Sequence, residues 1–288
     1  MITLTLLHDR HLAGTDAISR KTLSHWYRGT AKFKEVLMRP VKDETRDALW
    51  ASAALMGAIQ FATFEARTPE EAWPLKTRDT TDLDWLKMSD GKKAVFAIAD
   101  PTRADSVFAQ MSTGHATLWR PLLGPEACPD TDAVEMTRDF VDMFGLGPTS
   151  TSGNNNNNNP YYKAAMALAR LLHVPCDRNN VVEFFGFIVN INPDLKRLLD
   201  QKDAKALLLV VHWYAKLYRA QWWLHRRGMI EGHAICLYLD RHHGGDAKLQ
   251  RLLRWPKAEL GLDTSPSSEE GWALSGCSTD AAAVLCLI

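Results

Sequence analysis

Histidine and cysteine residues recur at helical spacing in two parts of the chain, and both residue types are common zinc ligands. His8 and His11 are three residues apart, but no third ligand follows nearby. His233 and Cys236 have the same spacing, with a pair of histidines further on. Cys236 stands in an apolar run, where a thiol usually packs as a small hydrophobic side chain. We therefore expect no metal site, and we interpret His8 and His11 as an exposed polar turn.

Acidic residues at one predicted helix start superficially resemble a magnesium motif of helical terpenoid enzymes. Asp43, Glu44 and Asp47 do not have the spacing of a paired Asp box, and Arg46 stands between them. The helix dipole stabilises carboxylates in a first turn, and we favour that explanation. The sequence also lacks a Gly-rich phosphate loop and a nucleophile elbow. We therefore expect no catalytic residues and no cofactor, and we predict that the protein is not an enzyme.

A basic cluster consists of Arg219, His225, Arg226 and Arg227. Such a cluster can hold an anion or an acidic partner, but a solvated helix face is the interpretation we favour. Over the whole chain, 34 basic residues balance 34 acidic residues. DNA-binding domains usually carry a basic excess or patch. We therefore expect no direct contact between this chain and DNA.

Bulky apolar residues provide the stronger functional signal, because the chain contains ten Trp and ten Phe. A cavity between helices that binds an apolar ligand needs such a lining. Ordinary core packing would use the same residues, and that alternative stays open for each of them. On apolar character alone, the candidate pocket residues are Trp50, Met56, Phe61, Phe184, Phe187, Trp213, Trp222, Trp223 and Met229.

Apolar residues spaced three and four apart predict helices along most of the chain, and hence an all-α, irregular multi-helix bundle or array. No segment of strict alternation is long enough for a sheet. Residues 184–189 have a strand-like composition, but their neighbours are helical and we predict a buried helix. The predicted helices are 3–12, 20–38, 43–66, 82–99, 133–144, 161–172, 181–188, 193–199, 204–217, 221–241 and 246–253.

Composition also predicts where the chain does not form helices. Residues 147–160 contain Gly-Pro, a Ser/Thr run and six consecutive Asn. Such a tract cannot pack a core, so we predict a flexible linker inside one helical domain, 1–257. We expect residues 101–130 to be irregular and residues 258–288 to be a loose C-terminal tail. No apolar run of about 18 residues is present, so no membrane span is expected.

Several short stretches occur together over about residues 2–257. They are HDRHL (8–12), HWYRG (25–29), RDALWASAALMG (46–57), TPEEAWPL (68–75), DWLKMSDGKK (84–93), WYAK (213–216) and QWWL (221–224). In their order and co-occurrence they resemble the C-terminal regulatory domain of fungal zinc-cluster transcription factors of the sterol-uptake-control type. None of the stretches is a catalytic motif.

The resemblance implies an all-helical ligand-sensing and activation domain that controls transcription by RNA polymerase II. Sterol-responsive members bind ergosterol, and sterol depletion frees the factor to move from the cytoplasm into the nucleus. Other members are pathway-specific regulators without a sterol ligand. The family's six-Cys zinc-cluster module is missing here, since no Cys precedes Cys128 and no Cys-x-x-Cys occurs.

Two hypotheses follow from the residues and the resemblance together. In the first, the chain is a regulatory domain whose partner is an apolar small molecule, a sterol being the first candidate. In the second, it is a helical interaction or dimerisation scaffold, with a second copy or a transcriptional co-regulator as the partner.

Overall fold

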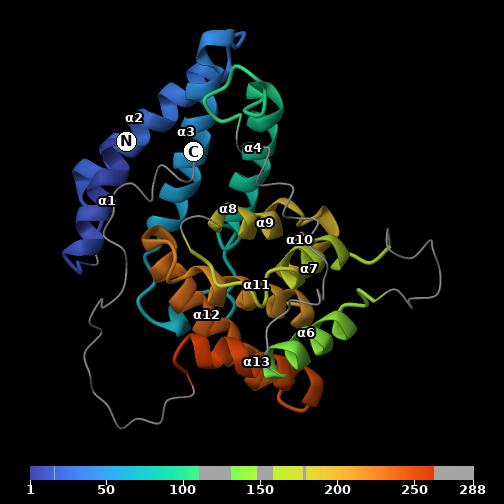
Figure 1. The fold of residues 1–288 in the computed structure, drawn as a ribbon. Helices are drawn as coiled ribbons and strands as arrows, with labels where there is room; N and C mark the ends of the chain where they lie inside the picture. The colour runs from blue at the N-terminus through green and yellow to red at the C-terminus, as the bar shows by residue number, and fades with distance from the viewer. Residues whose placement is uncertain (16, 110–130, 148–157, 178–179, 263–288) are drawn as a thin grey trace.

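The described part of the chain is helical (Figure 1). The computed structural model describes residues 1–15, 17–109, 131–147, 158–177 and 180–262. No strand occurs in these ranges, so the all-α prediction is confirmed. The α-helices are α1 (Ile2–Leu12), α2 (Arg20–Leu37), α3 (Arg46–Ala62), α4 (Asp84–Ala99), α6 (Thr131–Met143), α7 (Tyr162–Ala169), α8 (Val181–Phe184), α9 (Gly186–Val189), α10 (Pro193–Asp200), α11 (Ala204–Leu217), α12 (Trp222–His243) and α13 (Ala247–Glu259).

Helix α11 is the buried centre of the molecule. Asp203 begins this helix, since its carboxylate accepts a hydrogen bond from the backbone N–H of Ala206 at 2.9 Å. Every residue from Ala206 to Ala215 is buried. A helix that is apolar around its circumference must be enclosed by neighbours. Here α12 packs along α11, and α7, α8, α10 and α13 also contact it.

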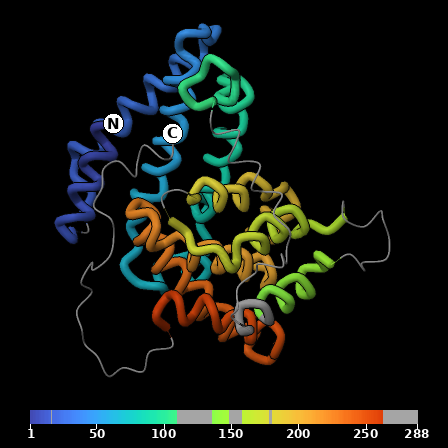
Figure 2. Tube along the Cα trace, in the orientation of Figure 1, coloured from blue at the N-terminus to red at the C-terminus, as the bar shows by residue number. Residues whose placement is uncertain are grey.

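Helices α2, α3 and α4 extend away from this centre (Figure 2). They have a small core of their own, to which α3 contributes Leu49, Trp50 and Ala53 and α4 contributes Val95 and Ala99. The main core combines side chains from before and after the Asn-rich segment, from Leu4 to Leu260. Helices α3 and α4 therefore contribute side chains to both cores.

Helix α3 is shorter than the predicted range 43–66. Asp43 lies in a short 3-10 turn, and the α-helix begins three residues later. The helix ends at Ala62, whose carbonyl accepts a hydrogen bond from Arg10 Nη1 at 3.4 Å. The carbonyl of Ala66 accepts from Arg226 Nε at 3.2 Å. Guanidinium groups from α1 and α12 thus bind carbonyls beyond the point where helical N–H groups are available.

Residues 101–109 form turns, as predicted, and Asp47 at the start of α3 holds them in place. Its carboxylate accepts hydrogen bonds from the Ser106 hydroxyl at 2.7 Å and from the Val107 backbone N–H at 3.0 Å. It also forms an ion pair with Arg103 at 2.8 Å. Asp47 therefore anchors a loop, in addition to its favourable interaction with the helix dipole. The rest of the predicted irregular segment, 110–130, lies outside the described residues.

The predicted linker lies mostly outside the described residues, which exclude 148–157. Its last residues are described, and Asn159 is part of the folded structure. Asn159 Nδ2 donates to the carbonyl of Phe144 at 2.9 Å, and its Oδ1 accepts from the Tyr161 backbone N–H at 3.0 Å. The prediction of a linker reaching residue 160 was therefore too long, because one Asn side chain joins α6 to the start of α7.

Helix α13 continues beyond its predicted end at Leu253 and through Pro256. The Tyr218 hydroxyl donates to the carbonyl of Glu259 at 2.5 Å, and Leu260 is buried. These contacts hold the end of the helix against α11 and α12, beyond a proline that cannot donate a backbone hydrogen bond. The prediction of a loose tail from residue 258 is therefore wrong for 258–262, and residues 263–288 lie outside the described part.

Candidate functional site

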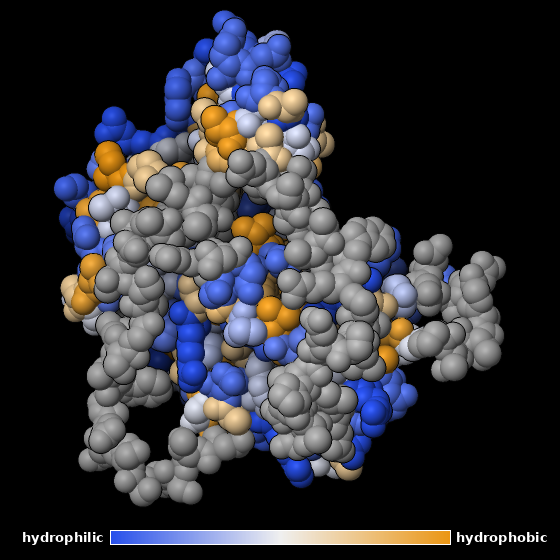
Figure 3. Space-filling model, in the orientation of Figure 1, coloured by the Kyte–Doolittle hydropathy of each residue, from blue (hydrophilic) through white to orange (hydrophobic). Residues whose placement is uncertain are grey.

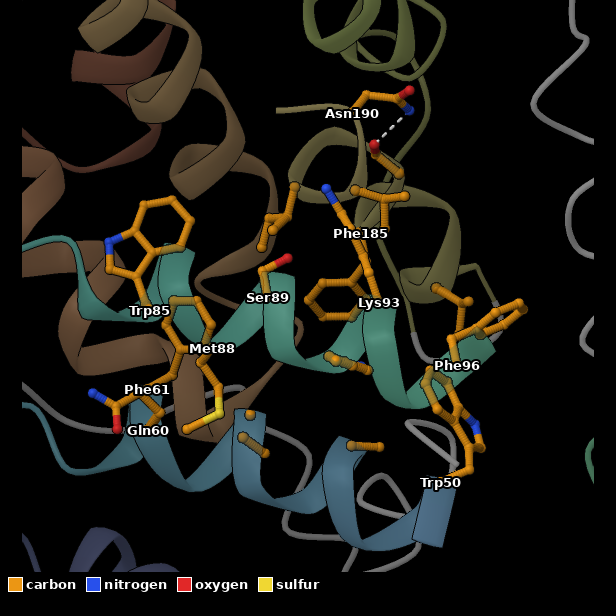
Figure 4. A pocket seen from close by; sticks show the side chains of 18 of the residues that line it. Trp50, Gln60, Phe61, Trp85, Met88, Ser89, Lys93, Phe96, Phe185 and Asn190 are labelled. Carbon is orange, nitrogen blue, oxygen red and sulfur yellow. Dashed lines mark hydrogen bonds between the residues drawn. The ribbon is translucent and has the colours of Figure 1, made fainter. Parts of the chain in front are cut away.

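A pocket of about 420 Å³ opens between α3, α4, the α8–α9 segment and the start of α12. Figure 4 shows α3 and α4 side by side, with α9 across the pocket from them. Sites for drug-sized ligands usually measure about 300–1,000 Å³ and are mostly apolar. The lining residues are Trp50, Ala54, Gly57, Ala58, Gln60, Phe61, Trp85, Met88, Ser89, Lys92, Lys93, Phe96, Val182, Glu183, Phe185, Gly186, Ile188, Val189, Asn190 and Trp223.

Small residues on α3 make room for the pocket. Ala54, Gly57 and Ala58 all line it, and a Cβ atom added at Gly57 would meet no other side chain within 4 Å. The Ala-rich sequence here predicts the close approach of a neighbouring helix, and α4 is that neighbour. Gly57 nevertheless leaves empty space, whereas protein interiors are normally filled to crystal-like density.

One face of α4 forms the adjacent wall. Trp85, Met88, Ser89, Lys92 and Phe96 line the pocket, and their spacing brings them to the same side of a helix. Figure 4 shows Trp85 and Phe96 at opposite ends of this wall. None of these α4 residues is among the predicted pocket residues, although their helical spacing is visible in the sequence.

Aromatic rings close the end of the pocket nearest the main core. The ring centroids of Phe61 and Trp223 are 5.6 Å apart, and those of Phe185 and Trp223 are 5.8 Å apart at an interplanar angle of 17°. Trp85 lies 5.7 Å from Phe61 and stacks on Trp213, which belongs to the buried core behind it. Such offset contacts hold the rings in fixed positions, so this wall is already formed without a ligand.

Residues 184–189 are helical, as predicted, but they form two short helices that meet at Phe185. The break turns Phe184 and Phe187 into the main core, where both are almost completely buried. Trp213 Nε1 donates to the carbonyl of Phe184 at 2.9 Å and fixes this arrangement. Phe185 instead lines the pocket.

Three of the nine predicted pocket residues line this pocket: Trp50, Phe61 and Trp223. The other six lie elsewhere. Phe184, Phe187 and Trp213 belong to the buried core, and Met56 and Met229 are half-buried outside the lining. Trp222 packs against His8 at a centroid distance of 4.9 Å.

Two lysines interrupt the apolar lining. Lys93 Nζ lies 3.8 Å from Asp90, so an acidic neighbour offsets its charge. Lys92 Nζ lies 5.2 Å from the ring centroid of Trp50, and no ion pair is formed between Lys92 and any described residue. Burial lowers the pKa of Lys92 to about 8, because an apolar environment disfavours the charged amine. Glu183 is the one carboxylate in the lining.

The lining is mostly apolar, with a few polar side chains. These are Gln60, Ser89, Lys92, Lys93, Glu183 and Asn190, and the lining as described contains no histidine and no cysteine. Large apolar walls with a few polar groups are typical of sites that hold a hydrophobic ligand in one orientation.

The predicted exposed turn at His8 and His11 is wrong. Both residues lie in α1, half-buried, and their rings contact Trp222 of α12. His11 also lies 6.1 Å from His225. Burial lowers the pKa of His11, with His225 and His8 contributing further. At the other candidate cluster, His233 Nε2 lies 2.7 Å from the carbonyl of Leu260.

The prediction of a solvated face is wrong for three members of the basic cluster, whereas the fourth, Arg219, is exposed to solvent. Arg227 is buried, with its guanidinium 4.7 Å from the ring centroid of Phe64 and its Nη1 3.4 Å from Glu231. Arg226 binds the Ala66 carbonyl, and His225 lies 3.1 Å from the Tyr218 carbonyl. These three residues therefore tie α12 to neighbouring segments, because their polar groups have partners inside the fold.

Two further observations concern the described residues. No group of three or more potential metal ligands occurs among them. Within the same residues, no helix has the length and apolar character needed to cross a bilayer. Comparisons with family models, with curated proteins and with solved structures found no match to this chain.

Proposed function

We propose that this chain is a ligand-responsive regulatory domain that binds a sterol or another apolar metabolite in the pocket between α3 and α4. By resemblance, it would belong to a fungal zinc-cluster transcription factor, act in the nucleus and control transcription by RNA polymerase II. A pathway-specific regulator with a ligand other than a sterol is included in this proposal. It assigns no catalysis and no direct DNA contact to this chain.

The unfilled apolar pocket is the observation that supports the proposal. Aromatic contacts fix its inner wall, while Gly57 leaves space that no described side chain occupies. A rigid apolar ligand would bury its surface there at a gain of about 25 cal/mol per Å². Gln60 and Ser89 also line the pocket and can bind a hydroxyl group of such a ligand. The pocket joins helices of both cores, so a ligand would couple them.

The melting temperature of the purified chain with and without ergosterol tests this proposal. A ligand that binds only the folded state adds about 2.7 kcal/mol at 100 times its Kd. For a chain of this size, that corresponds to a rise of roughly 5–10 °C. We expect ergosterol to raise the melting temperature more than an unrelated neutral lipid of similar hydrophobicity.

A rise with another apolar metabolite and none with ergosterol would support a regulator without a sterol ligand. A folded chain whose melting temperature responds to no apolar compound would contradict the proposal. It would favour the scaffold hypothesis, for which α2 provides a specific observation. Leu23, Tyr27 and Leu37 of α2, and Met38 after it, are large apolar side chains exposed to solvent.

A further inference from the structure

The pocket contains a positive charge without a matching negative charge. Lys92 lines it, and its amine lies over the ring of Trp50 without an ion pair to any described residue. Its neighbour Lys93 is offset by Asp90, which also forms an ion pair with Lys196. The α3 and α12 walls contribute no charged side chain to the lining. Lys92 is therefore the lysine of the lining that has no carboxylate partner among the described residues.

Lys92 is half-buried. An ammonium among apolar side chains without a counter-charge is costly, and an anion brought next to it would relieve that cost. Glu183 on α8, the one carboxylate of the lining, forms no ion pair with Lys92. The cation–π contact with Trp50 offsets only part of the lost hydration, since such contacts contribute about 0.5–2 kcal/mol. The amine thus stays available to a ligand that has apolar bulk and an acidic group.

We propose that the natural ligand is an apolar acid whose carboxylate pairs with Lys92 while its hydrocarbon body contacts the aromatic wall. This inference rests on the proposed function, because it requires that the pocket takes an apolar ligand. It narrows the proposed class of apolar metabolites to an amphipathic carboxylate, either steroidal or long-chain, and a neutral sterol would bind through the apolar contacts alone. Ion-paired hydrogen bonds are roughly twice as strong as neutral ones, so the acidic group would dominate selectivity.

Matched pairs of ligands test the headgroup separately from the hydrocarbon. Cholanoate and its methyl ester, and dodecanoate and its methyl ester, are titrated against the whole chain by calorimetry at pH 7. We expect at least one acid to bind about tenfold more tightly than its ester, a difference of about 1.4 kcal/mol. In Lys92→Met this preference should disappear while ester binding persists, and Lys92→Arg should retain the preference.

Lys87→Met is the matched control. Lys87 lies on the same helix, but its side chain is exposed and pairs with Asp84 outside the pocket. This variant should keep the wild-type preference for the acid. If Lys93→Met removes the preference and Lys92→Met does not, the assignment to Lys92 is overturned.

A pH series on the wild-type chain provides a second readout that does not depend on any variant folding. The pKa of Lys92 in the free protein is about 8, and a bound carboxylate would raise it. Acid binding should therefore be tight below pH 8 and weaken as the pH rises above that value. Lys93 and Glu183 are the other titratable groups of the lining. Ester binding should stay constant over the same range.

The outcomes separate the two proposals. Equal binding of acid and ester overturns the headgroup inference and leaves the apolar pocket in place. Failure of all four compounds and of ergosterol to bind the folded wild-type chain overturns both. Preferential binding of the acid that persists in Lys92→Met shows that another group holds the carboxylate, and it also overturns the inference.

Discussion

At the scale of single residues, a buried charge network connects α11 to α12 behind the pocket. Glu231 accepts a hydrogen bond from the Tyr214 hydroxyl at 2.5 Å and lies 3.4 Å from Arg227. Burial raises the pKa of the Glu231 carboxyl, against the opposing effects of Arg227 and Tyr214. Arg227 also lies over Phe61, a pocket residue. The network therefore positions one wall of the pocket.

Glu231→Gln should lower the free energy of unfolding by about 3 kcal/mol, since the buried Arg227 then lacks its counter-charge. Urea unfolding of the variant and the wild type measures this difference. Replacing both partners, with Arg227→Met and Glu231→Leu, should cost much less, because it leaves no unpaired charge. A single variant as stable as the wild type would show that the ion pair contributes nothing to folding.

At the scale of elements, two glycines differ in how closely the neighbouring helices approach them. On α12, a Cβ atom added at Gly228 would lie 2.9 Å from Cβ of Tyr218, closer than such atoms pack. On α3, a Cβ atom added at Gly57 would meet no other side chain within 4 Å. The same residue type thus allows close packing on one helix and forms an empty pocket wall on the other.

The same substitution at these two glycines should have opposite effects. Gly228→Ala should destabilise the chain by about 1–3 kcal/mol through overpacking against α11. Gly57→Ala should stabilise it by up to about 1 kcal/mol, because alanine favours the helix over glycine. Thermal unfolding of both variants measures the two effects. Stabilisation by Gly228→Ala would mean that α12 and the residues after α11 pack less closely than described.

At the scale of the whole molecule, buried and half-buried histidines make the fold sensitive to acid. Figure 3 shows a hydrophilic upper end, with apolar side chains gathered below it. Inside, burial lowers the pKa of His212 to about 4 and also lowers the pKa of His11, His225 and His233. Protonation of these histidines should therefore destabilise the fold.

The chain should lose stability as the pH falls from about 6.5 to 4. Over this range these four histidines bind more protons in the unfolded chain than in the folded chain. Their contribution to the free energy of unfolding therefore decreases as the pH falls. The shift at His212 alone corresponds to roughly 3 kcal/mol, at 1.36 kcal/mol per pKa unit.

Melting temperatures measured between pH 7 and pH 4 check this effect. His212→Phe should reduce the dependence, since a neutral aromatic ring suits the site between Phe140 and Trp255. Equal acid sensitivity of the variant and the wild type would assign the effect to other groups.

The helices could be predicted from the sequence because their apolar periodicity is local. The pocket could be predicted only in part, since the empty space depends on how helices meet. Phe184, Phe185 and Phe187 lie in the same apolar stretch of sequence. The break between α8 and α9 turns only Phe185 toward the pocket. Lys92 lies in a charged stretch of sequence, and its position in the pocket depends on its contact with Trp50 of α3. The burial of the basic residues on α12 could not be predicted for the same reason, because their partners come from distant segments.

The most direct test of the central claim is the ligand-induced rise in melting temperature, measured on the wild type and on Gly57→Leu. A leucine at Gly57 has room to extend into the pocket, so the variant should fold at least as stably without ligand. We expect a rise for the wild type and for Gly29→Leu, whose site on α2 is exposed and equally open, and no rise for Gly57→Leu. An equal rise in Gly57→Leu, or none in the wild type, would contradict an apolar ligand site between α3 and α4.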